Sequence, residues 1–245
     1  MAIRGVTFDW WGTIAVIPPR EEAAPLRDLR IARLESGLRE RRIPVDRAVL
    51  LEAYERQGDL LEDVWARHRE LDPAEQVGAF LRFAGLDGED PGLVALVGES
   101  LGAAILARPP RMFPNLVPTF DRLAARGLAI GLISNTGRTW GRYLTDLQGT
   151  FGIGRYFRFR GYSDELRVRK PDPRIFRAVL AGLGLPPEEV VHVGDDVIAD
   201  VGGASAVGMR AAWFNTGFWP GARTDEAVAE VHDHADLPAV LEALG

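Results

Sequence analysis

Four sets of polar residues in this chain could carry out chemistry on a phosphate group. They are Asp9; Ser134, Asn135 and Thr136; Lys170; and Asp195, Asp196 and Asp200. Carboxylates are the hard oxygen ligands that Mg²⁺ prefers, and this metal usually completes its octahedron with water and substrate oxygens. Hydroxyl and amide groups suit phosphate oxygens, and a lysine supplies a compact positive charge. A carboxylate can also attack phosphorus, which fits Asp9 as a nucleophile.

Each of these sets also has an ordinary structural explanation. An aspartate after a strand often caps a turn, Ser-Asn-Thr and Gly-Asp-Asp are common in loops, and a single lysine usually lies on the surface. Their positions argue for function, because the sets fall in order along the chain at the predicted ends of strands or before a helix. In open parallel sheets, ligands bind outside the carboxyl ends of the strands.

The composition narrows the possible chemistry. The 245 residues include no cysteine, which excludes disulfides, thiolate metal sites and cysteine nucleophiles. Lys170 is the only lysine, so any reaction that needs a lysine amine must use it.

Charge and hydropathy narrow the partners and the location. The formal net charge is −6, and no segment gathers Lys and Arg into a stripe, so we expect no nucleic-acid partner. No apolar run approaches the roughly 18 residues of a membrane span, and the N-terminus lacks a secretory signal. We therefore expect a cytoplasmic protein with no membrane partner. The sequence carries no prediction of an oligomeric state.

The elements that must position the four sets are buried strands. Residues 3–8 predict a strand that ends at Asp9, and the runs 128–133 and 190–193 predict two more. Further strands are predicted over 158–162 and 210–214, and helices over 116–126, 140–147, 173–183, 200–207 and 237–244. Strands that alternate with helices indicate an α/β fold, with a parallel sheet covered by helices on both faces.

A helical block separates the first strand from the rest of the sheet. From about Glu21 to Leu106, apolar residues recur at helical spacing, with breaks before Pro44, Pro73 and Pro91. The run Asp72–Glu75 resembles a capped first turn. The sequence therefore predicts about four helices inserted into an α/β core.

Four segments of the chain resemble the signature motifs of one family. FDWWGT, LISNT, RKPDPRIF and HVGDDVIAD resemble, in order, the motifs of the haloacid dehalogenase-like hydrolase superfamily, and the helical block is similar to its α-helical cap. The resemblance implies a Rossmann-like catalytic core over residues 1–15 and 110–245, and a cap domain over residues 16–109.

The resemblance also implies a role for each residue of the site. Asp9 would be the nucleophile, Lys170 would stabilise charge, and Ser134 and Asn135 would contact the phosphate or the transition state. Mg²⁺ would be held by Asp9, the main-chain carbonyl of Trp11 and Asp195. Asp196 and Asp200 would complete the acidic set, and Asp200 would contact the metal ligands and not the ion itself. The implied substrate is a small phosphorylated molecule.

Trp11 departs from the pattern of phosphatases in this family. They usually carry a second aspartate at this position, which protonates the leaving group and activates water. An indole cannot do this, and loss of a general acid or base typically costs about 10² to 10⁴ in rate. The structural alternative is a packing residue at the interface of cap and core, and packing is the role we favour for Trp10.

Three alternatives share this lack of a second aspartate. In true haloacid dehalogenases an aromatic residue occupies the position of Trp11, but those enzymes use no Mg²⁺ and have lost the acidic fourth motif, which this chain retains. Phosphonoacetaldehyde hydrolases need a cap lysine, which this chain lacks. A catalytically weak or inactive protein that kept the fold is the third alternative. The retained acidic residues favour a Mg²⁺-dependent phosphatase that forms an aspartyl-phosphate on Asp9.

Overall fold

The computed structural model describes residues 2–17 and 24–245 of the chain. It separates into two compact units. The first comprises Met1–Ile17, Pro110–Asn135 and Gln148–Gly245, and the second comprises Pro18–Pro109 and Thr136–Leu147. The predicted start of the helical block, near Glu21, lies outside the described residues. Among those residues, no helix has both the length and the apolar composition that a membrane span needs.

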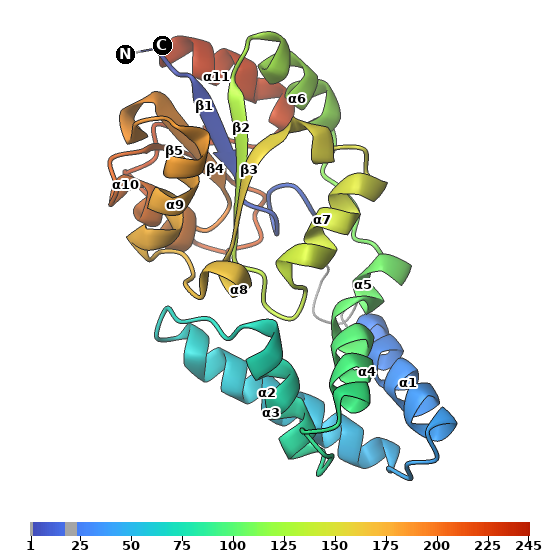
Figure 1. Ribbon diagram of the computed structural model, residues 1–245. Coiled ribbons are helices and arrows are strands. Elements are labelled where there is room, and N and C mark those ends of the chain that lie inside the picture. The colour runs from blue at the N-terminus through green and yellow to red at the C-terminus, as the bar shows by residue number, and fades with distance from the viewer. Residues whose placement is uncertain (1, 18–23) are drawn as a thin grey trace. The chain divides into compact units, whose positions relative to one another are not determined.

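The first unit is built on a parallel six-stranded sheet, shown in Figure 1. Its strands are β1 (Gly5–Phe8), β2 (Ala129–Ser134), β3 (Phe157–Tyr162), β4 (Val190–Gly194), β5 (Arg210–Phe214) and β6 (Ala229–Val231). The order across the sheet is β3-β2-β1-β4-β5-β6, and every pairing is parallel. The predicted α/β fold is therefore confirmed. Strand β6 is not predicted by the sequence, because three residues with Glu230 at their centre are too short for a periodic pattern.

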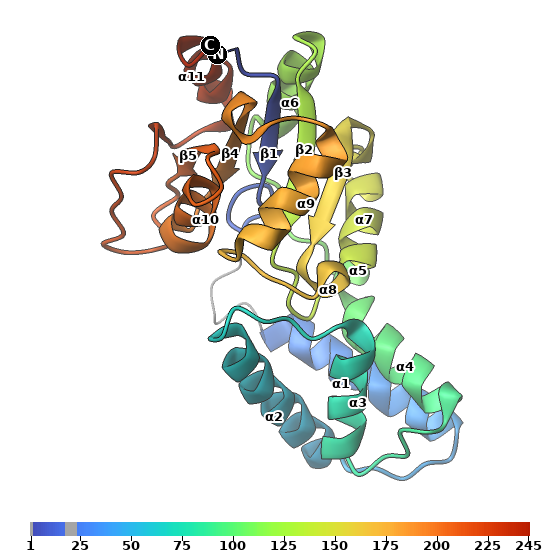
Figure 2. The ribbon, with the colours of Figure 1, turned by 60° about the vertical axis from the view of Figure 1, so that its left-hand side comes forward.

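Helices cover both faces of this sheet, as the alternation of side chains along the strands requires. On one face, Phe8 packs against Phe120 of helix α6 (Leu116–Ala125), with ring centroids 4.9 Å apart. On the other face lies α9 (Pro173–Leu183), in front of β2 and β3 in Figure 2. A side chain at Gly131 would meet Val179 and Leu183 of α9, so β2 and this helix are in close contact.

The remaining helices of the first unit are short. They include α8 (Ser163–Leu166), the π-helical turn η4 (Val197–Gly202), α10 (Gly203–Ser205) and α11 (Leu237–Ala243). The 3₁₀ turns are η2 (Gly154–Tyr156), η3 (Pro187–Glu189) and η5 (His234–Asp236). Helix α9 has the bounds that the sequence predicts: Asp172 caps its start, Pro173 is its first residue, and Gly184 ends it in the left-handed conformation. The helix predicted over 200–207 starts earlier and is divided between η4 and α10.

The second unit is helical. It contains α1 (Ala24–Glu40), α2 (Arg47–Trp65), α3 (Pro73–Phe83), α4 (Pro91–Gly102) and α5 (Ala104–Ala107). The capped turn predicted before α3 is present, since the Asp72 side chain accepts from Glu75 N at 2.8 Å and the Glu75 side chain accepts from Asp72 N at 2.9 Å.

Residues 136–147 cluster with the helical unit, although the sequence analysis assigned them to the core. Two contacts explain this. The Trp140 indole N–H donates to the Gln76 side chain at 3.0 Å, and the Arg138 guanidinium donates to the Tyr54 carbonyl at 2.7 Å. Helix α7 (Gly141–Thr150) therefore begins in one unit and ends in the other.

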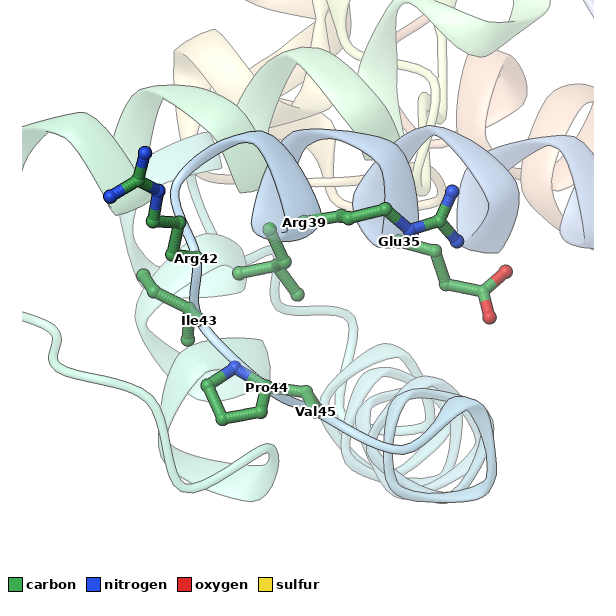
Figure 3. Close-up of a pocket in the computed structure, with 7 residues that line it drawn as sticks. Glu35, Arg39, Arg42, Ile43, Pro44 and Val45 are labelled. Atoms are coloured by element: carbon green, nitrogen blue, oxygen red, sulfur yellow. The ribbon is translucent and has the colours of Figure 1, made fainter.

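A pocket of about 360 Å³ lies at the end of α1, where the chain turns toward α2 (Figure 3). Its lining residues are Glu35, Leu38, Arg39, Arg42, Ile43, Pro44 and Val45. The Glu35 carboxylate forms an ion pair with Arg47. None of these residues belongs to the four polar sets of the sequence.

Candidate active site

Asp9 follows β1 directly, and its side chain is almost completely buried. Its main-chain N–H donates to the Val193 carbonyl of the neighbouring strand β4 at 2.9 Å, which fixes the backbone at this point. The Oδ1 atom lies 2.6 Å from Nζ of Lys170. Burial raises the pKa of Asp9 to about 7, although the positive charge of Lys170 lowers it.

Lys170 precedes α9 and links two carboxylates. Its Nζ lies 2.6 Å from Oδ1 of Asp9 and 2.6 Å from Oδ1 of Asp200. Burial alone would lower the pKa of this lysine, but the two carboxylates raise it above its ordinary value. The Asn135 side chain holds the lysine backbone on both sides, accepting from Lys170 N at 2.9 Å and donating to Lys170 O at 3.2 Å. Asn135, predicted to contact substrate, thus positions Lys170.

Asp200 lies at the centre of a buried hydrogen-bonded chain. Besides Lys170, it contacts Nε2 of His192 at 3.0 Å and accepts from the main-chain N–H of Asp196 at 3.0 Å. Nδ1 of His192 is 2.9 Å from the Thr7 hydroxyl, and these two residues face each other in the β1–β4 pairing. Burial would raise the pKa of Asp200, but Lys170 and His192 hold it well below its usual range. Asp200 is therefore the buried counter-charge of the lysine.

Asp195 accepts hydrogen bonds from two tryptophans. The Trp213 indole N–H donates to its main-chain carbonyl at 2.9 Å, and the Trp219 indole N–H donates to Oδ2 at 2.8 Å. Gly12, at φ +78°, leaves room for this carboxylate, because a Cβ there would come within 2.3 Å of Oδ2. Burial and then the charges of Asp200 and Asp9 raise the pKa of Asp195 to about 8.

Three of these carboxylates could hold a metal ion. Asp9, Asp195 and Asp200 each offer an oxygen, and these oxygens all lie within 4.8 Å of one another. With Lys170 as the only cation bonded to this cluster among the described residues, full ionisation would leave a buried net charge of −2. Such a charge is costly without compensation, and a divalent cation would neutralise it. The donor set therefore fits Mg²⁺.

Asp196 lies outside this cluster, although the sequence analysis placed it with the metal ligands. Its Oδ1 accepts from the main-chain N–H groups of Ile198 at 2.8 Å and Ala199 at 2.9 Å. This carboxylate therefore caps the start of η4. Neighbouring aspartates of one motif thus have separate tasks, because the tight π-helical turn directs Asp200 inward.

Two buried hydroxyl groups, one after β1 and one at the end of the neighbouring β2, have no hydrogen-bond partner among the described residues. They are Oγ of Ser134, at the end of β2, and Oγ1 of Thr13. A buried hydroxyl without a partner is costly, so each of these groups calls for an explanation. The predicted phosphate contact would supply a partner for Ser134.

Trp10 and Trp11 lie in a tight turn after Asp9, in which the Trp10 carbonyl accepts from the N–H groups of Ile14 and Ala15. The Trp10 ring is buried and stacks on Phe151, at a centroid distance of 6.4 Å and an angle of 19°. The Trp11 ring is half-buried and meets Trp10 edge-on. Packing within the core unit accounts for Trp10. The carbonyl of Trp11 as a metal ligand stays a prediction.

Three residues that contact the site are not predicted by the sequence: His192, Trp213 and Trp219. His192 lies within the quoted motif HVGDDVIAD, and the pairing of β1 with β4 would have pointed to Thr7 as its neighbour. Trp213 ends up beside Asp195 because it is paired with Gly194 across the β4–β5 ladder. Trp219 lies in an irregular loop, and no pattern in the sequence predicts its contact.

A family model described as haloacid dehalogenase-like hydrolase matches residues 3–208, which is most of the chain. The chain belongs to this family. The match includes all four polar sets, so the resemblance of the motifs is confirmed and the protein is a haloacid dehalogenase-like hydrolase.

Several relatives within this family are named as phosphatases. Over 113 residues the chain is 34% identical to a phosphoserine phosphatase of Thermus thermophilus, covering 44% of this chain and 43% of that protein. Over 138 residues it is 33% identical to a glyceraldehyde 3-phosphate phosphatase of Pyrococcus furiosus, covering 55% of each. The chain thus matches about half the length of these curated relatives.

Solved structures of both reaction types resemble the whole chain. A 2-haloacid dehalogenase from Pseudomonas syringae has a TM-score of 0.68 at 28% identity, covering 99% of this chain and 100% of that one. A haloacid dehalogenase-like phosphatase from Thermococcus onnurineus has a TM-score of 0.61 at 26% identity, covering 98% of each chain. The relatives and structural neighbours of this chain within the haloacid dehalogenase-like family thus include both phosphatases and dehalogenases.

Proposed function

We propose that this hydrolase is a Mg²⁺-dependent phosphatase that acts on a small phosphorylated metabolite through an aspartyl-phosphate on Asp9. The observation that carries the proposal is the buried cluster of Asp9, Asp195, Asp200 and Lys170. Its carboxylate oxygens lie within 4.8 Å of one another, and its net charge when ionised is −2. A dehalogenase that displaces halide from carbon has no use for such a divalent-cation site.

In the proposed reaction, an oxygen of Asp9 forms a bond to phosphorus while the bond from phosphorus to the leaving oxygen breaks. The electron pair departs on that oxygen. Water then attacks phosphorus, and the bond to Asp9 breaks with its electron pair restoring the carboxylate. The phosphate that leaves carries the oxygen and both protons of the water, and the first leaving oxygen takes a proton from solvent. Bound Mg²⁺ would neutralise charge on the phosphate oxygens and hold the substrate against Asp9. Its ligands would be Asp9, Asp195 and the Trp11 carbonyl.

The other residues of the cluster prepare the nucleophile. Lys170 lowers the pKa of Asp9, which favours the ionised form that attacks, and it offers positive charge to the transferring group. Asp200 and Asn135 hold Lys170 in place. The unpartnered hydroxyl of Ser134 is available to donate to a phosphate oxygen.

Trp11 bears on the substrate class. With no carboxylate at this position, the leaving oxygen receives no proton from the enzyme there, so esters of strongly basic alcohols should react slowly. Acyl and aryl phosphates need no such help. The relatives are named for varied substrates, including phosphoserine and glyceraldehyde 3-phosphate, and the proposal therefore stays with the leaving group rather than one metabolite.

The test is hydrolysis of an aryl phosphate with Mg²⁺ and with chelator, in the wild type and in Asp9→Asn. We expect phosphate release that requires the metal and is lost in Asp9→Asn, because the amide cannot attack phosphorus. Trp11→Asp should raise turnover of alkyl phosphates, by up to about 10²-fold, more than turnover of the aryl phosphate. The proposal would be refuted if none of these esters released phosphate in a metal-dependent way.

A dehalogenase is the second candidate, because Trp11 is aromatic and a 2-haloacid dehalogenase shares 28% identity over the full length. Chloride release from 2-chloropropionate that is indifferent to chelator would establish it. A folded protein that binds Mg²⁺ but releases neither phosphate nor chloride would instead be a catalytically weak or inactive binding protein.

A further inference from the structure

Asp195 and Asp200 are supported in different ways. The two oxygens of Asp200 contact Lys170, His192 and the Asp196 main chain. For the Asp195 carboxylate, the hydrogen bond recorded among the described residues comes from Trp219. When the three carboxylates are ionised, as metal binding requires, Asp195 faces the like charges of Asp9 and Asp200, and its side chain would gain electrostatically by rotating away from them. The indole N–H opposes that rotation.

The loop after β5 brings Trp219 to this position through an anchored turn. Asn215 donates from its main chain to the Val231 carbonyl at 2.9 Å, and its side chain accepts from Gly217 N at 3.0 Å. Gly217 has a φ of +76°, which lets the chain reverse. The Trp219 carbonyl then accepts from Ala222 N at 3.1 Å. The indole thus reaches Asp195 from a defined turn and not from an unsupported segment.

Packing does not explain why this residue is a tryptophan. The Trp219 side chain is 45% exposed, whereas Trp213, which holds the Asp195 carbonyl, is 6% exposed. Phe218 beside it is similarly exposed, and its ring meets Trp219 edge-on at 5.0 Å. A phenylalanine could make the same apolar contacts as Trp219. The feature that a phenylalanine lacks is the N–H that points to Oδ2 of Asp195.

We propose that Trp219 is a positioning residue for the metal site: its indole N–H holds the Asp195 carboxylate toward Asp9 and so sets the affinity for Mg²⁺. The inference rests on the proposed function, because it takes Asp195 as a metal ligand. Partners that orient a ligand from outside typically contribute 10- to 100-fold to metal affinity. The loop of residues 215–222 therefore tunes the metal site without contacting the ion.

The decisive variant is Trp219→Phe, which keeps an aromatic ring and removes the N–H. Its matched control is Phe218→Leu, which changes the neighbouring exposed ring and keeps the N–H. Calorimetric titration of the metal-free proteins with Mg²⁺, and with Mn²⁺ followed by electron paramagnetic resonance, measures the affinity. We expect the affinity for both metals to fall by about 10-fold or more in Trp219→Phe and to change by less than about twofold in Phe218→Leu. The midpoints of thermal unfolding in chelator should be similar.

An NMR measurement tests the same contact without relying on affinity. In protein labelled with ¹⁵N at the tryptophan indoles, the resonance that is lost in Trp219→Phe should shift when Mg²⁺ is added to the wild type. Equal metal affinities in wild type and Trp219→Phe, or an indole resonance that does not shift when metal is added, would overturn this inference and leave the proposed function standing. A wild type that binds neither Mg²⁺ nor Mn²⁺ would overturn the metal site and the proposed function together.

Discussion

His192 and His234 are both fully buried, but they lie on opposite faces of the sheet and in different surroundings. On the face covered by α9, His192 meets Phe176 edge-on at 5.4 Å and connects Thr7 to Asp200. On the face covered by α6, His234 stacks on Phe214 at 4.4 Å.

The bonds of the two rings show what each histidine does. Nε2 of His192 points to a carboxylate that also binds Lys170, so this ring belongs to the charged chain behind Asp9. Nε2 of His234 lies 2.8 Å from the Thr13 carbonyl, and a carbonyl can only accept, so this ring donates to the backbone of the nucleophile loop. One face of the sheet therefore supports the charges of the active site, and the other supports its backbone.

Substitutions on the charged face should reduce turnover and stability more than substitutions on the other face. Lys170→Met leaves Asp9 and Asp200 buried without their cation. We expect turnover of an aryl phosphate at saturating Mg²⁺ to fall by about 10²- to 10³-fold, because a preorganised positive charge is lost. The free energy of unfolding in urea should fall by about 3 kcal/mol, as when one partner of a buried ion pair is removed.

The control for Lys170→Met is Arg174→Met, which removes an exposed cation near the start of α9 that binds Asp172. Its unfolding free energy should change by less than about 1 kcal/mol, and turnover should be retained. If Lys170→Met keeps more than a tenth of wild-type turnover, the charged chain is structural only and the contrast between the two faces fails.

On the face that supports the backbone, His234 should make the folding stability depend on pH. Burial lowers the pKa of His234 to about 4, whereas an unfolded histidine titrates near 6.5. Between these values the unfolded state binds a proton that the folded state does not, so folding stability should decrease as pH falls from about 6.5 to about 4. The loss from this group is about 3 kcal/mol at most, and it is absent at pH 7 and above.

Two variants separate the titration of His234 from its hydrogen bond. His234→Gln keeps an N–H donor for the Thr13 carbonyl and does not titrate, so urea unfolding should lose this part of the pH dependence. His234→Phe loses both the proton and the donor, and it should also be less stable at pH 7 by about 1 kcal/mol. Identical pH profiles for the wild type and both variants would contradict the neutral, donating histidine.

Part of the active site could be predicted from the positions of the strands in the sequence. Asp9, Ser134 and Asp195 could be predicted as neighbours because the carboxyl ends of parallel strands meet at one edge. Lys170 lies before a helix, and the resemblance of its motif placed it with them. The separate tasks of Asp195, Asp196 and Asp200 could not, since they depend on how one π-helical turn orients each side chain.

The support on the other face was also beyond prediction from the sequence. His234 is 221 residues from Thr13, and the two are joined by one hydrogen bond that no periodic pattern encodes. Trp219 likewise reaches Asp195 from an irregular loop. Regular elements thus place the groups that could react, while isolated side chains from loops decide how those groups are held.

The smallest effects are expected when one buried threonine hydroxyl is removed on each face of the sheet. Thr7→Val leaves the buried Nδ1 of His192 without its hydroxyl partner, and Thr119→Val removes a 2.9 Å hydrogen bond to the main-chain carbonyl of His234. Both side chains are buried, both changes conserve shape, and each should cost about 1 kcal/mol of unfolding free energy. Stability alone therefore does not distinguish them.

Turnover should distinguish the two variants. The hydroxyl of Thr7 orients His192, which orients Asp200 and through it Lys170, so Thr7→Val should lower kcat by a few-fold, consistent with about 1 kcal/mol in the barrier. Thr119→Val acts on the backbone of residue 234 and should leave kcat unchanged. A double-mutant cycle of Thr7→Val with Asp200→Asn would measure the coupling directly. Additive effects on kcat would mean that the chain from Thr7 to Lys170 transmits no orientation, and that both histidines serve the fold alone.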